Sequence, residues 1–208
     1  EDGAQSFGAT SKERKSCGQT TLATTSFFPS KPLGCYGDGG AIFTNDDALA
    51  LACRQVRAHG EESRYHHVKV GMNGRIDTLQ SAILLSKLNV FDEEIAQRQI
   101  VAGRYFSGLQ GLDGLVLPHI LNHNQSVYAQ FTVRVADRDG FRAKLQEAEV
   151  PTAVHYPLPI YRQPAYAEDG VALEEADCAS REVVSLPFSP WLSLDDQSRV
   201  IDAVSRAL

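Results

Sequence analysis

The chain has 208 residues, of which 43% are hydrophobic, and it carries a formal net charge of −6. A chain of this length can bury a sizeable core in one or two domains, and its acidic balance gives no reason to expect nucleic acid or an anionic membrane as a partner. The four cysteines have no metal-finger spacing, which predicts reduced thiols in a cytoplasmic protein.

The first predicted elements are two short strands that enclose a stiff loop. Thr20–Phe28 is rich in Thr and Phe, a composition typical of a strand, and Ala41–Thr44 predicts the next one. Prolines and glycines interrupt regular structure between them, so Ser26 and Lys31 are expected on the loop that leaves a strand. A lysine confined between two prolines can act as an amine nucleophile, although this stretch alone fits an ordinary turn as well.

The middle of the chain predicts two helices separated by a loop, after a loop at Gly8–Gln19. Asn45 is a candidate N-cap for a helix over Asp46–His59, and Gly60 is its stop signal. A loop over Glu61–Gly74 follows, and Asp77 then begins a long helix with a local irregularity at Asn89. The side chains expected to face inward are Leu49, Ala52 and Val56 in the first helix and Leu79, Ile83, Leu88, Phe91 and Ile95 in the second.

The last part of the chain alternates between strand and helix patterns. Alternating apolar residues predict a half-buried strand over Ser126–Val135, and a helix with Phe141 and Leu145 inside is expected over Arg138–Ala148. The remaining predicted elements are a strand beginning at Pro151–His155 and helices over Leu173–Val184 and Leu194–Leu208. This alternation favours an α/β or α+β domain.

Four short motifs follow one another in the chain. They are Glu1-Asp2-Gly3-Ala4-Gln5, Ser26-Phe27 with Lys31, Gly37-Asp38-Gly39-Gly40, and the stretch Gly71–Gln80 with the sequence GMNGRIDTLQ. In this order and spacing the chain resembles the DegT/StrS family of pyridoxal-phosphate-dependent sugar aminotransferases, from Glu1 to about Leu208. Within that family it is most similar to the branch that aminates a UDP-linked 3-keto-N-acetylglucosaminuronic acid.

The resemblance implies an α/β fold of the fold-type-I, aspartate aminotransferase-like class. Residues 1–88 would be the remainder of the large domain that binds pyridoxal 5′-phosphate. Residues 89–208 would form the inter-domain helix and the small C-terminal domain. The N-terminal part of the large domain is expected to lie outside this chain.

The resemblance also assigns the cofactor-binding residues. Lys31 would be the lysine that holds the cofactor as a Schiff base and then moves the proton, and Asp2 would keep the pyridine nitrogen protonated. Gln5 would reach the ring oxygen. Ser26 would bind the phosphate, together with Asn73 from a neighbouring subunit.

Three further residues are candidate substrate ligands. Arg75 can hold a carboxylate by a two-pronged contact, which suits both glutamate and a uronic acid, but pairing with Asp77 is an alternative. His155 and Tyr156 lie where the resembled branch contacts its sugar, although a structural role for His155 is nearly as well supported. The adjacent His66 and His67 would point to opposite faces, so no metal site is predicted.

The expected activity is transfer of an amino group from glutamate to a keto nucleotide sugar, UDP-2-acetamido-2-deoxy-3-oxo-glucuronate, for surface polysaccharide such as O-antigen. A homodimer with shared active sites is implied. Alternatives are another nucleotide-sugar aminotransferase of the family and a non-catalytic regulatory or ligand-binding relative. Relatives that dehydrate sugars carry His at the Schiff-base position, and Lys31 argues against that activity.

Overall fold

The computed structural model describes residues 1–167 and 170–208, which form two compact units. The first unit contains Glu1–Ala96 and Ile120–Ala129, and the second contains Gln97–His119 and Gln130–Leu208. In the described part of the chain, no helix has both the length and the apolar character needed to cross a membrane.

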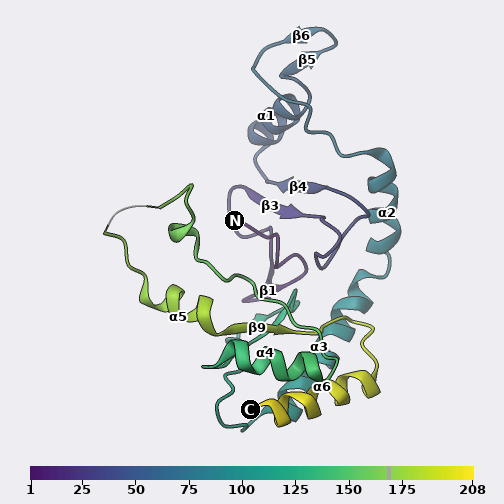
Figure 1. The fold of residues 1–208 in the computed structure, drawn as a ribbon. Coiled ribbons are helices and arrows are strands. Elements are labelled where there is room, and N and C mark those ends of the chain that lie inside the picture. The colour runs from purple at the N-terminus through teal and green to yellow at the C-terminus, as the bar shows by residue number, and fades with distance from the viewer. Residues whose placement is uncertain (168–169) are drawn as a thin grey trace. The chain divides into compact units, whose positions relative to one another are not determined.

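The first unit is built around an antiparallel pair of strands, β3 (Ala23–Ser26) and β4 (Gly40–Phe43), in which Ser26 lies opposite Gly40 (Figure 1). Both strands were predicted from their composition, and both predictions are confirmed. The N-terminal segment runs along β3, because Asp2 forms a parallel bridge with Thr24. This bridge brings the first motif of the chain to the strand that precedes the lysine loop.

A second small sheet contains the strands β2 (Arg14–Lys15), β1 (Thr10–Ser11) and β7 (Asn124–Gln125), in that order. The expectation of a plain loop at Gly8–Gln19 is therefore wrong. The β1–β2 turn has positive φ angles at Lys12 and Glu13, and β7 pairs with β1 from far along the chain. Neither feature has a local sequence signal.

The helix α1 (Asp47–Arg57) was predicted, but its N-cap is Asp46 rather than Asn45. The Asp46 carboxylate accepts hydrogen bonds from the backbone N–H groups of Ala48 and Leu49, at 2.8 and 3.0 Å. The one buried residue of α1 is Gln55, whereas Val56 is 37% exposed. The prediction that Val56 lies on a buried apolar face of this helix is therefore wrong.

The strands β5 (Glu61–Ser63) and β6 (His66–His67) follow α1 and form a hairpin where a loop was expected (Figure 1). Their neighbour along the chain is α2 (Thr78–Leu88), followed by α3 (Phe91–Leu109). The predicted irregularity at Asn89 is confirmed as the break between them. Burial was predicted wrongly in α2, because Leu79 is 70% exposed and Leu88 is 50% exposed, whereas Phe91 is buried.

The second unit has an antiparallel pair, β8 (Phe131–Arg134) and β9 (Val183–Leu186), with the helices α4 (Arg138–Glu147), α5 (Glu174–Glu182) and α6 (Leu194–Ala207). A short 3-10 helix, η1, covers Ile160–Arg162. The largest fully buried side chains of this unit are Tyr105, Phe131, Leu109, Leu145 and Gln197. The Tyr105 hydroxyl donates to the Pro187 carbonyl at 2.6 Å, and burial raises the pKa of that phenol.

Three element boundaries after Ser126 differ from the sequence prediction. The strand expected over Ser126–Val135 is regular only in β8, and the strand expected at Pro151–His155 is a single bridge between Ala153 and Ser185. The helix expected over Leu173–Val184 ends at Glu182, because Val183 and Val184 pair with β8 instead. In each of these segments, the extent of the regular element is set by pairing with a strand that is distant in sequence.

Candidate active site

Lys31 lies in the loop between β3 and β4. Its backbone N–H donates to the Phe28 carbonyl at 2.9 Å, which closes a tight turn. Its side chain is half-buried and makes no hydrogen bond or ion pair within residues 1–167 and 170–208. The next four residues, Pro32 to Cys35, are all buried. The unpaired amine of Lys31 therefore directly precedes a well-packed part of the loop.

Asp2 is held beside β3 by backbone hydrogen bonds. The Gly3 N–H donates to the Thr24 carbonyl at 2.7 Å, and the Thr24 N–H donates to the Glu1 carbonyl at 2.9 Å. The Asp2 side chain is exposed, and its Oδ1 accepts the Ala4 N–H at 3.0 Å. This bond orients the carboxylate and leaves Oδ2 available to a further donor.

Ser26 ends β3, two residues after Thr24, so both side chains lie on the same face of the strand. Its Oγ accepts the Phe28 N–H at 3.2 Å, which leaves the hydroxyl proton free to donate. Gln5 is exposed in the turn after Asp2, and its amide has no hydrogen bond among the residues that the structure describes.

Asn73 and Arg75 lie between the hairpin and α2, and both are exposed. Asn73 forms a backbone bridge with Ala58, and the Gly74 N–H donates to the Arg57 carbonyl at 2.8 Å. The Arg75 guanidinium has no ion pair among the described residues, so the alternative pairing with Asp77 is absent there. The segment is fixed by its backbone, and both side chains are left unpaired.

His155 and Tyr156 belong to the second unit. The His155 Nδ1 lies 3.3 Å from the Ser185 hydroxyl, and the two aromatic rings meet edge to face at 5.4 Å. Both residues line a largely apolar cavity of about 1150 Å³. Tyr156 is 66% exposed, and the contact with Ser185 gives His155 a structural role as well.

A polar cluster that sequence reasoning missed begins at Tyr161, which is one of the residues that line this cavity. The Tyr161 hydroxyl donates to Asp177 Oδ2 at 2.6 Å, and Arg162 donates to the same oxygen. The Arg162 hydrogen bond, and then that from Tyr161, lowers the pKa of the Asp177 carboxyl below its usual value. The cluster joins η1 to α5 across about fifteen residues of sequence, a separation at which no local pattern indicates a contact.

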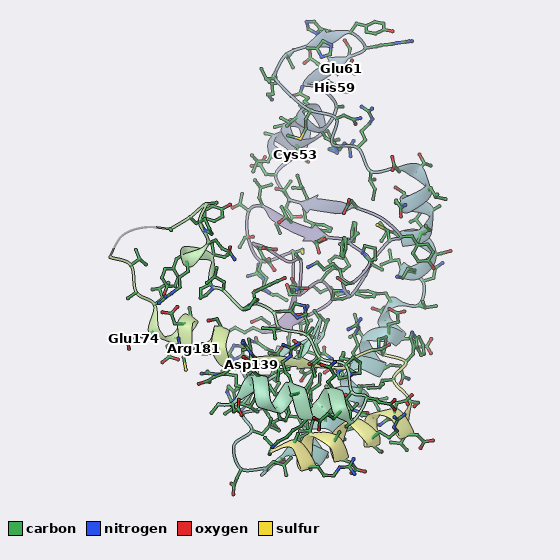
Figure 2. All side chains as sticks on the ribbon, in the orientation of Figure 1. Cys53, His59, Glu61, Asp139, Glu174 and Arg181 are labelled. Carbon is green, nitrogen blue, oxygen red and sulfur yellow. The ribbon has the colours of Figure 1, made fainter. Side chains whose placement is uncertain are left out.

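The two adjacent histidines of the hairpin make separate contacts with acids. The His66 Nδ1 lies 3.5 Å from Glu62, and the His67 Nε2 lies 3.8 Å from Glu61. Figure 2 labels His59 and Glu61 at the foot of this hairpin. Within the described residues, no three His, Cys, Asp or Glu side chains gather as a metal site would require.

The fold is that of the fold-type-I pyridoxal-phosphate-dependent transferases. The crystal structure of DesV from S. venezuelae, in complex with a ketimine intermediate, matches with a TM-score of 0.94 at 39% identity. That match covers 98% of this chain and 56% of DesV. The structure of NtdA from Bacillus subtilis, with the bound cofactor PMP, matches with a TM-score of 0.83 at 29% identity, over 90% of this chain and 46% of NtdA.

The chain belongs to the DegT/DnrJ/EryC1/StrS aminotransferase family, whose model matches residues 1–205. The UDP-2-acetamido-2-deoxy-3-oxo-D-glucuronate aminotransferase of Pseudomonas aeruginosa is 57% identical to it over 192 residues. That alignment covers 92% of this chain and 53% of the relative. The chain thus spans about half the length of the curated relatives that it matches.

The residues around β3 fit the cofactor of this family. Pyridoxal phosphate needs an amine, a carboxylate for its pyridine nitrogen and hydroxyl or N–H donors for its phosphate. Lys31 has an unpaired amine, Asp2 has a free carboxylate oxygen, and Ser26 has a hydroxyl proton to donate. All three lie on or beside one strand and the loop that follows it.

Proposed function

We propose that the whole protein is a cytoplasmic aminotransferase dependent on pyridoxal phosphate. It moves an amino group from glutamate to UDP-2-acetamido-2-deoxy-3-oxo-glucuronate, in the synthesis of a surface polysaccharide such as O-antigen. The observation that carries the proposal is the unpaired Lys31 amine on the loop after β3, with Asp2 bound to the same strand. The choice of substrate is supported by the 57% identity to a Pseudomonas aeruginosa enzyme that is named as the aminotransferase of this sugar.

Each residue near β3 has a separate role in this proposal. When bound, the cofactor withdraws electrons from the carbon that carries the migrating amino group. Lys31 would hold the cofactor through its side-chain amine, and the same amine would take and return the proton at that carbon. The free oxygen of Asp2 keeps the pyridine nitrogen protonated, Gln5 orients the ring oxygen, and the Ser26 hydroxyl binds the phosphate.

Substrate recognition is assigned to exposed side chains with unused donors. The unpaired Arg75 guanidinium holds the carboxylate of glutamate and then that of the uronic acid. His155 and Tyr156 contact the sugar. Asn73, on the same segment as Arg75, completes the phosphate site of a second subunit, so the protein works as a homodimer with shared active sites.

The test replaces Lys31 by Ala in the whole protein, with Lys15→Ala on the exposed strand β2 as the control. We expect wild type and Lys15→Ala to show the visible absorbance band of bound cofactor, and glutamate to bleach it. Lys31→Ala should lose both the band and turnover. Turnover that persists in Lys31→Ala would contradict the assignment.

The sugar is tested separately, by comparing keto nucleotide sugars with and without the C6 carboxylate. Arg75→Lys keeps the charge but removes the two-pronged geometry, so we expect the preference for the uronic acid to fall about tenfold to a hundredfold. Equal rates with a neutral keto sugar would favour another nucleotide-sugar aminotransferase. No transamination with any of them would favour a non-catalytic relative.

A further inference from the structure

The loop that carries Lys31 is folded tightly on itself. Leu33 is 4% exposed and Cys35 is fully buried. A side chain at Gly34 would meet the Phe28 and Pro29 carbonyls at 2.7 Å, so only glycine fits there. The buried part of the loop therefore has little freedom of its own, and whatever fixes it also fixes Lys31.

The helix α2 holds this loop at two points. The Lys87 ammonium donates to the Gly34 carbonyl at 2.6 Å, and the Gln80 Oε1 accepts the Tyr36 N–H at 2.8 Å. Gln80 and Lys87 are two turns apart and so share one face of α2. Lys87 also lies 5.9 Å from the centre of the Tyr36 ring. One helix face thus binds the loop on both sides of Cys35.

The loop is shaped to accept these contacts. A Cβ atom at position 37 would lie 3.1 Å from the Gln80 amide nitrogen. Because residue 37 is glycine, the Gln80 side chain has room to reach the loop. From the inside, the Cys35 Sγ lies 3.0 Å from both the Phe27 and the Gly37 carbonyls. The thiol and the helix therefore both hold the residues from Gly34 to Gly37 in place.

We propose that Gln80 and Lys87 are positioning residues that fix Lys31 for its reaction with the cofactor. This rests on the proposed function, because it assigns Lys31 the covalent bond. Reaction rates fall steeply when reacting groups are displaced by about 1 Å, so a loop released from α2 would present the amine less often in the productive position. Neither residue needs to touch the cofactor for this.

The experiment uses the whole protein and the variants Lys87→Met and Gln80→Met, which keep chain length but lose the donor or the acceptor. Gln80→Glu restores an acceptor for the Tyr36 N–H. The matched control is Lys144→Met, because the Lys144 ammonium also donates to a backbone carbonyl, that of Ala207 at 2.7 Å, in the second unit. Hydrogen exchange of a peptide covering 31–37 and the dissociation constant of pyridoxal phosphate are both measured.

We expect faster exchange in the peptide covering 31–37 and about tenfold weaker cofactor binding in both Lys87→Met and Gln80→Met, since each variant loses one of the two hydrogen bonds that tie the loop to α2. Gln80→Glu should recover most of both, and Lys144→Met should change neither. Unchanged exchange and binding in the two methionine variants would overturn the proposal. Exchange needs no cofactor, so it tests the α2 contacts even if the wild type bound no pyridoxal phosphate, an outcome that would contradict the proposed function instead.

Discussion

At the scale of single residues, the side chains proposed for cofactor binding each keep a hydrogen-bonding group unused among the described residues. The Asp2 carboxylate has one occupied oxygen, which accepts a backbone N–H, and Ser26 has a free proton. In Asp177 the occupied oxygen instead accepts from two side chains, those of Tyr161 and Arg162. The four motifs led directly to Asp2, Ser26 and Lys31. The Asp177 cluster has no such motif, and only the structure reveals it.

Asp177→Asn should lower the stability of the second unit at neutral pH, because it removes a carboxylate whose pKa is lowered by Arg162 and Tyr161. A lowered pKa in the folded state stabilises the fold above the unfolded value of 3.8 and ceases to do so as pH falls through the folded value. The gap in thermal midpoint between wild type and variant should therefore narrow from pH 7 to about pH 3.

The matched control is Asp139→Asn, which removes an ion pair with Arg138. Figure 2 labels Asp139 on α4. The Asp139 side chain is 79% exposed, and Arg138, which is 16% exposed, keeps its hydrogen bond to the Ser180 carbonyl at 2.6 Å without it. The variant should therefore melt close to the wild type at both pH values. A gap for Asp177→Asn that stays constant with pH would show that its charge is not what stabilises the unit.

At the scale of elements, helices with local start signals were predicted well, whereas the β2–β1–β7 sheet and the β5–β6 hairpin were not predicted. Asp137 accepts the Gly140 N–H at 3.0 Å, and Ser193 accepts that of Asp196 at 3.0 Å, so α4 and α6 begin where their caps indicate. The hairpin β5–β6 depends instead on a close crossing of two glycines at its base. Gly60 has a φ of +75°, and a side chain at Gly71 would lie 2.2 Å from the Gly60 nitrogen.

Gly71→Ala should destabilise the first unit by about 1–3 kcal/mol, because backbone rather than a flexible side chain blocks the added carbon. Hydrogen exchange in residues 61–70 should become faster. Gly103→Ala is the control of opposite sign. It lies within α3 with nothing within 4 Å of the added carbon, so it should stabilise the protein by about 0.5–1 kcal/mol. Equal effects of the two substitutions would contradict the crossing.

At the scale of the whole chain, the sequence indicated the fold class but not the path between the two units. Residues 120–129 return to the first unit after α3, and Thr10 pairs with Gln125 there. A pairing between residues so far apart leaves no periodic signal in either segment. The apolar pattern of α2 also misled the assignment of its inward face, since no residue of that helix is buried in this chain. Periodicity detects an apolar face but does not identify what covers it.

The core of the second unit gives the last prediction. Leu145 on α4 is fully buried, and Val204 on α6, Phe131 on β8 and Val184 on β9 are fully buried in the same unit. Leu145→Ala in the whole protein should lower the free energy of unfolding of this unit by about 2–5 kcal/mol, because it leaves a cavity. Leu194→Ala, at a site that is 60% exposed, should change it by less than about 0.5 kcal/mol. Urea titration read by hydrogen exchange in β8 and β9 measures both, and similar losses in the two variants would contradict the place of Leu145 in this core.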